Sequence, residues 1–347
     1  MAAERVERLA AHIAPAPVAA TASSHPVTSA KKPKSDDDVV IVSAVRTPIA
    51  RGHKGSFKNT VTEDLLTAVL KAVVEKVNVP KSAVQDIQVG NVLPLGGGAL
   101  VARQATFYAG FPHTTSLATL NRQCSSGLQA VANIVAAIRA GNIDVGIGAG
   151  VESMTLNYGP QTYPEKMSEK MNENTLAQDC LVPMGITSEN VAEAFKVDRA
   201  KQVFFSFSPF VRLLTNKSQQ DKLAVASHAK AIKAQKEGKF VEIVPVTVKI
   251  TDKDGTEKTV TLTADEGPRE GTTLEGLLKL APAFKEGGTT TAGNSSQVSD
   301  GAAAVLLMKR SKAKELGVKP LARFLSFAVV GVPPNVMGIG YALVLVL

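Results

Sequence analysis

The feature that most constrains the fold is an alternation of short apolar runs with apolar stripes at helical spacing. Residues 39–44 form a continuous apolar run, which is typical of a strand buried on both faces. Residues 62–78 then place leucines and valines on one side of a helix, with Thr62 as a plausible N-cap. A second buried strand follows at residues 87–93, and the alternation continues to a strand that ends at Glu152. This pattern predicts an α/β fold with a substantially parallel sheet.

The composition fits a globular protein of about two domains. Of 347 residues, 44% are hydrophobic and 5% aromatic, and the absence of tryptophan argues against a site of stacked aromatic rings. The net charge of +8 comes from dispersed lysines and arginines, which favours a solvated surface over nucleic-acid binding. A phosphorylated small molecule remains a reasonable partner. No apolar run reaches the roughly 18 residues that a membrane span requires.

Cysteine and glycine spacing limits the expected cofactors. Cys124 and Cys180 are the two cysteines, and their contexts predict no disulfide, no metal site and a reducing compartment. The glycines at 146, 148 and 150 do not form the dinucleotide-binding fingerprint. We interpret them as positions where a helix approaches a strand closely, and we expect no nicotinamide or flavin cofactor.

Residues 1–37 differ from the rest of the chain. Alanine, proline, serine and threonine dominate, and the segment runs into the charged stretch KKPKSDDD, residues 31–38, which predicts a flexible leader and linker. Arg5, Val6, His12 and Ile13 resemble the second-type peroxisomal targeting nonapeptide: arginine, an aliphatic residue, five residues, histidine, an aliphatic residue. The alternative is a disordered tail with an accidental helical turn.

Cys124 stands directly before a predicted helix. The apolar stripe that predicts this helix consists of Leu128, Val131, Ile134, Val135 and Ile138. Unpaired backbone N–H groups at a helix start stabilise a thiolate and can also bind a developing oxyanion. The position therefore predicts a nucleophile for acyl chemistry. The alternative is a buried cysteine that packs as a small apolar side chain.

The stretch LNRQCSSGLQAVANIVAAI, residues 120–138, resembles the acyl-enzyme signature of the thiolase family. Five further segments are similar to family segments in the family order, at residues 45–57, 148–154, 183–192, 291–304 and 330–340. Together with the targeting nonapeptide, they resemble the peroxisomal 3-ketoacyl-CoA branch of the family most closely.

This resemblance implies a layered thiolase fold with a mixed, largely parallel sheet, a division into domains, and a partner and compartment for the chain. After the leader, an N-terminal core domain is expected at 38–160, a loop domain at 161–285, and the start of a second core domain at 286–347. The resemblance also implies a homodimer in the peroxisomal matrix, which a peroxisomal import receptor recognises through the leader.

The implied reaction is thiolytic cleavage in fatty-acid β-oxidation. Cys124 would attack the 3-keto carbon of a 3-ketoacyl-CoA, release acetyl-CoA, and hold the shortened acyl group until free CoA removes it. CoA is thus a substrate, and no separate cofactor is implied. The residues that match family positions around the thioester and the pantetheine arm are Met184, Phe284, Ala292 and Ser296. Cys180 is interpreted as a packing residue.

The chain departs from the family pattern in two ways. None of its histidines lies in the Gly-His-Pro segment that carries the family base, and the second catalytic cysteine is absent. The second core domain is therefore expected to be incomplete and the chain inactive. Residues 203–220 interrupt a helix, and we interpret them and residues 341–347 as intron-derived. The alternative is a genuine Phe-rich loop and a natural truncation.

Two other functions stay open. One is a catalytically dead form that still binds CoA or dimerises. The other is a related condensing enzyme, such as a ketoacyl or hydroxymethylglutaryl synthase, although the ordered VRTP and GNSS segments favour a thiolase.

Overall fold

The computed structural model describes residues 33–159, 162–164, 166–195, 219–251 and 255–340. The predicted targeting residues Arg5, Val6, His12 and Ile13, most of the predicted insert (203–218) and residues 341–347 lie outside the described residues. The predictions made for them stay predictions.

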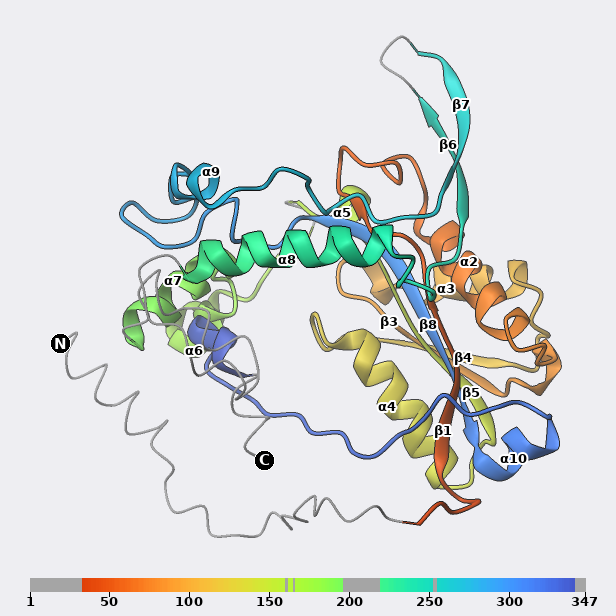
Figure 1. The fold of residues 1–347 in the computed structure, drawn as a ribbon. Helices are drawn as coiled ribbons and strands as arrows, with labels where there is room; N and C mark the ends of the chain where they lie inside the picture. The colour runs from red at the N-terminus through yellow and green to blue at the C-terminus, as the bar shows by residue number, and fades with distance from the viewer. Residues whose placement is uncertain (1–32, 160–161, 165, 196–218, 252–254, 341–347) are drawn as a thin grey trace.

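One mixed sheet forms the centre of the molecule, in the order β4-β3-β5-β8-β1-β9, with the short β2 also paired to β8 (Figure 1). Its strands are β1 (Val39–Arg46), β2 (Ala50–Arg51), β3 (Asp86–Gly90), β4 (Ser116–Leu120), β5 (Val145–Ser153), β8 (Ser299–Lys309) and β9 (Ala322–Arg323). Strand β3 is parallel to β4 and β5, whereas β8 is antiparallel to β5, β1 and β2. Strands β1 to β5 therefore share one direction, which confirms the mixed, largely parallel sheet.

Strand β8 corrects the predicted domain division. Residues 286–347 were assigned to the start of a second core domain, but β8 lies inside the first sheet, between β5 and β1. Val305, for example, is paired with Gly148 on one side and with Ala44 on the other. The assignment is therefore wrong for Ser299–Lys309. The predicted division followed the order of segments along the chain, whereas a central strand can come from a segment far along the chain.

Helices cover both faces of this sheet, so the core has three layers (Figure 1). On one face, α2 (Thr62–Glu75) and α3 (Ala99–Tyr108) pack on alternate strand residues such as Val40 and Leu306. On the other face, α4 (Ser126–Arg139) packs on the residues between them, such as Val39 and Leu307. The N-cap position of α2 belongs to Val61, one residue before the predicted Thr62, and Val61 offers no side-chain acceptor.

The remaining elements surround this core. They are η1 (Lys81–Ala83), η2 (Leu95–Gly98), α5 (Met154–Asn157), η4 (Glu169–Glu173), α6 (Thr175–Asp179), α7 (Met184–Ala194), α8 (Gln219–Lys236), the hairpin of β6 (Val246–Thr251) and β7 (Glu257–Leu262), α9 (Leu274–Leu278), α10 (Arg310–Glu315) and η6 (Pro334–Ile339). The hairpin projects from the molecule, and α8 crosses above the sheet (Figure 1). Within the described ranges, no helix is both long and apolar enough to cross a membrane.

Candidate active site

The predicted nucleophile lies in the turn between β4 and α4. Strand β4 ends at Leu120, Ser125 occupies the N-cap position, and α4 begins at Ser126, so Cys124 lies just before the helix, as predicted. Cys124 is exposed. The alternative of a buried, packed cysteine is therefore wrong, and the thiol is accessible to a substrate.

Local hydrogen bonds fix the conformation of this turn. The backbone N–H of Arg122 donates to Ser126 Oγ at 2.8 Å, and that hydroxyl donates to the carbonyl oxygen of Gln123. Gln123 has a φ of 49°, a left-handed conformation that is uncommon for a residue with a side chain. The backbone N–H of Gln123 donates to Asn121 Oδ1 at 2.8 Å, which supports this conformation. The residue before Cys124 is thus held in one geometry.

Glycines allow α4 to lie directly on the strands beneath it. A Cβ atom at Gly148 of β5 would lie 2.6 Å from the Cα of Val131, and one at Gly90 would collide with the backbone of Ser126. Gly150 lies similarly close to Gly127. The interpretation of these β5 glycines as points of close approach is confirmed. Because Gly90 is the last residue of β3, the start of α4 lies at the carboxyl end of that strand.

A half-buried glutamate, Glu152, contacts the loop that lies beside the cysteine turn. Glu152 Oε2 accepts the backbone N–H of Val92 at 2.8 Å and that of Leu93 at 3.4 Å. The carbonyl oxygen of Val92 accepts the side-chain amide of Asn121 at 3.1 Å. Burial raises the pKa of Glu152, although the two N–H donors oppose this rise. The sequence analysis recognised Glu152 only as the end of a strand.

The residues predicted to contact the acyl-CoA all lie at the surface. Met184, Phe284, Ala292 and Ser296 are each exposed, as a substrate channel requires. Met184 is the first residue of α7, and the ring of Phe284 lies against the next residue, Gly185. The structure therefore brings the Met184 and Phe284 regions together. No hydrogen bond between described residues links these four side chains to Cys124, and their roles stay predictions.

A second glutamate connects α7 to the segment that carries Ala292. Glu189 is only 4% exposed, and its carboxylate accepts the backbone N–H groups of Thr289 and Thr290 at 2.7 to 3.0 Å. Burial alone would raise the pKa of Glu189, but these donors hold it below its ordinary value. The sequence did not predict this contact. A carboxylate followed by a distant Thr-rich segment gives no local signal.

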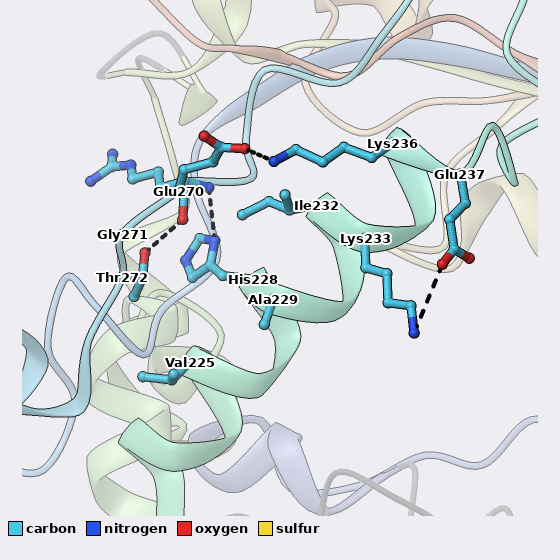
Figure 2. A pocket seen from close by; sticks show the side chains of 11 residues that line it. Val225, His228, Ala229, Ile232, Lys233, Lys236, Glu237, Glu270, Gly271 and Thr272 are labelled. Carbon is cyan, nitrogen blue, oxygen red and sulfur yellow. Dashed lines mark hydrogen bonds and ion pairs between the residues drawn. The ribbon is translucent and has the colours of Figure 1, made fainter.

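A groove of about 500 Å³ lies between α8 and residues 269–272, and Figure 2 shows the side chains that line it. His228 Nδ1 accepts the backbone N–H of Arg269 at 3.1 Å, which joins the two walls. Lys236 pairs with Glu270 across the groove, and Lys233 pairs with Glu237 on the helix. None of the predicted site residues lines this groove.

Cys180 follows α6 and is exposed, with its thiol donating to the carbonyl oxygen of Leu176 at 3.4 Å. Its assignment as a packing residue is therefore wrong. The described residues contain no cluster of histidine, cysteine, aspartate and glutamate side chains able to hold a metal ion.

A three-layer α/β core that presents an exposed cysteine at the start of a helix suits an enzyme that forms an acyl-cysteine intermediate. The model of the thiolase N-terminal domain matches residues 39–208 and 212–311, a range that includes β8. The chain belongs to the thiolase family.

Individual relatives agree with this assignment. The chain is 51% identical over 340 residues to mouse (Mus musculus) peroxisomal 3-ketoacyl-CoA thiolase A, covering 97% of this chain and 76% of the relative. It is 51% identical to the human (Homo sapiens) peroxisomal 3-ketoacyl-CoA thiolase, covering 91% and 70%. The crystal structure of the dimeric peroxisomal thiolase of Saccharomyces cerevisiae superposes with a TM-score of 0.75 at 42% identity, covering 88% and 73%.

Proposed function

We propose that this chain forms the acyl-enzyme of thiolytic 3-ketoacyl-CoA cleavage in peroxisomal fatty-acid β-oxidation, with Cys124 as the acyl acceptor. Because the sequence contains neither a Gly-His-Pro segment nor the second catalytic cysteine, we expect acylation of Cys124 without sustained turnover. The observation that carries the proposal is the exposed Cys124 held just before α4. The relatives named above are peroxisomal 3-ketoacyl-CoA thiolases, and this chain covers more than two thirds of the length of each.

The chemistry begins with attack of the Cys124 thiolate on the 3-keto carbon. The bond between C2 and C3 of the substrate then breaks, its electrons pass to the acetyl-CoA enolate, and a proton on C2 completes acetyl-CoA. The shortened acyl group stays on Sγ as a thioester. In the second half, the CoA thiol gives up its proton, attacks the thioester carbonyl and regenerates the cysteine. N–H groups in the first turn of α4 suit stabilisation of negative charge near Cys124.

In this proposal, Met184, Phe284, Ala292 and Ser296 contact the acyl-CoA, and CoA is a substrate rather than a bound cofactor. Support comes from their exposure and from the contact of Phe284 with Gly185 beside Met184. Arg5, Val6, His12 and Ile13 would bring the chain to the peroxisomal matrix through an import receptor.

We also propose a homodimer. The yeast peroxisomal thiolase is described as dimeric. In the described part of this chain, β4 is paired only with β3 and forms an edge of the sheet. An unpaired edge is a template for a further strand. Sedimentation velocity tests this proposal, and a monomer at all protein concentrations would contradict it.

The decisive experiment uses the full chain with Cys180→Ser, so that Cys124 is the remaining thiol. After incubation with acetoacetyl-CoA, intact-mass and peptide mass spectrometry should find an acetyl group on Cys124 and acetyl-CoA in solution. Cys124→Ala should show neither. Failure to acylate a Cys124 thiol that iodoacetamide still modifies would reject the function. CoA binding by calorimetry without acylation would favour the catalytically dead form, and a requirement for malonyl-CoA would favour a condensing enzyme.

A further inference from the structure

We propose that Glu152 is a positioning residue for Cys124, acting through residues 91–93 and Asn121. This inference rests on the proposed role of Cys124 as acyl acceptor. Glu152 makes no recorded contact with the cysteine itself. Its effect on the reaction passes through the loop that follows β3 and the turn that follows β4.

The connection consists of three consecutive hydrogen bonds. Glu152 Oε2 accepts the backbone N–H of Val92 at 2.8 Å. The carbonyl oxygen of Val92 accepts Asn121 Nδ2 at 3.1 Å. Asn121 Oδ1 accepts the backbone N–H of Gln123 at 2.8 Å, one residue before the nucleophile. The first two bonds cross between segments and the third lies within the cysteine turn, so the glutamate is connected from β5 to that turn.

The turn needs such support because Gln123 adopts a left-handed conformation. For a residue with a side chain this conformation is disfavoured, and it persists where surrounding contacts hold it. The Asn121 side chain supplies one of these contacts, and its own place depends on the Val92 carbonyl. Loss of the hydrogen bond to Glu152 would therefore release Val92, the Asn121 side chain and the backbone of Gln123 from their present positions.

The burial of one carboxylate oxygen of Glu152 is otherwise unexplained. Its Oε1 atom is buried and has no hydrogen-bond partner among the described residues. By contrast, Glu189 and Asp300 accept hydrogen bonds at both of their carboxylate oxygens. An unpaired buried oxygen costs free energy, and such costs gather at functional sites. If the side chain at position 152 only filled space, an apolar residue would be more favourable there than a glutamate.

Reactivity of the Cys124 thiol provides the test, because alkylation requires neither acyl-CoA nor a completed reaction cycle. In the Cys180→Ser background, the second-order rate constant of iodoacetamide with Cys124 is measured across about pH 6 to 10. Glu152→Ala should lower the rate constant about tenfold, since small displacements of a reacting group cost at least that much. Glu152→Gln keeps an oxygen acceptor for Val92 and should lower it about threefold.

The matched control is Glu266→Ala, which removes another half-buried carboxylate that accepts backbone N–H groups, those of Arg51 and Ser56, away from the cysteine turn. Its alkylation rate should stay within about twofold of the parent. Asn121→Ala should reproduce the effect of Glu152→Ala, and the double variant should fall no further, because both act on one connection.

A folded Glu152→Ala variant with the parent rate and pH profile would overturn the proposal. If Glu152→Ala does not fold, the Glu152→Gln variant decides, and an unchanged rate again overturns it. A fall equal to that of Glu266→Ala would also overturn it, since general loosening of the structure would then explain the result. If acetoacetyl-CoA fails to acylate Cys124 while the alkylation rate still depends on Glu152, the proposed function is rejected and the positioning role of Glu152 stands.

Discussion

The Oε1 atom of Glu189 lies 2.7 Å from the backbone nitrogen of Thr290, although the two residues are 101 positions apart. The same carboxylate accepts the N–H and the hydroxyl of Thr289. One side chain therefore holds the segment before Ala292 against α7, which begins at Met184. This carboxylate, together with the Lys285–Glu193 ion pair, helps to fix the relative placement of the predicted acyl-CoA contacts.

The Glu189 contact predicts a pH-dependent stability. Its pKa lies below the ordinary value of 4.5, so the stabilisation is present above that value and is lost as the pH falls through the lowered pKa. Glu189→Gln should cost roughly 2 kcal/mol at neutral pH, because charged acceptors give the stronger hydrogen bonds. Urea unfolding at neutral and acidic pH measures both effects. An equally steep acid dependence in the variant would show that Glu189 is not responsible.

Gly148→Ala should destabilise the core by about 2 kcal/mol or more, as overpacking does. The added Cβ would lie 2.6 Å from the Cα of Val131, which is backbone and cannot move without α4. Gly331→Ala is the control, since a Cβ there meets nothing within 4 Å, and its effect should stay within about 0.5 kcal/mol. Chemical denaturation compares the two. Equal stabilities would refute the close approach of α4 to β5.

Arg46→Lys should lower the free energy of unfolding by about 1–3 kcal/mol, because lysine cannot reproduce a forked contact. Arg46 donates to both carboxylate oxygens of Asp265, at 2.6 and 3.0 Å, and also to Glu242 at 3.0 Å. Lys279→Ala, which breaks an exposed pair with Glu275, should change stability by less than about 0.5 kcal/mol. Thermal unfolding tests this difference, and a lysine variant as stable as the parent would argue against it.

Gly185→Ala should weaken acyl-CoA binding with little loss of stability. A Cβ at this position would occupy the place of the Phe284 ring, which is 44% exposed and free to turn outward. Calorimetric titration with acetyl-CoA should show at least about a threefold weaker affinity, on the order of 0.7 kcal/mol. Gly331→Ala again serves as the control. Unchanged affinity would remove Phe284 from the proposed binding surface.

Local patterns predicted the separate elements well. The apolar run at 39–44, the stripe at 62–78 and the stripe after Cys124 became β1, α2 and α4, because burial on a strand or helix imposes its period on the sequence. The position of Cys124 followed from the same reasoning. The N-cap of α2 was placed one residue too late, at Thr62 rather than Val61, since Val61 offers no side-chain hydrogen bond.

Long-range relations were not predictable in this way. The strand β4 was not recognised, and β8 was assigned to another domain, because pairing partners leave no mark on local spacing. Glu152 and Glu189 were missed as organisers for the same reason. Each acts on backbone N–H groups, and a backbone partner can belong to any residue type.

The central place of β8 has a consequence for biosynthesis. Val39 of β1 is paired with Lys309 of β8, so the first strand cannot pair with β8 until a segment 270 residues later (309 minus 39) has been synthesised. Until the ribosome has released that segment, the inner edges of β1 and β5 have no neighbour and present apolar side chains. Such high contact order slows folding and exposes nascent chains to misassociation. A chaperone that shields these two edges would therefore decide how much of the newly made chain reaches its native core.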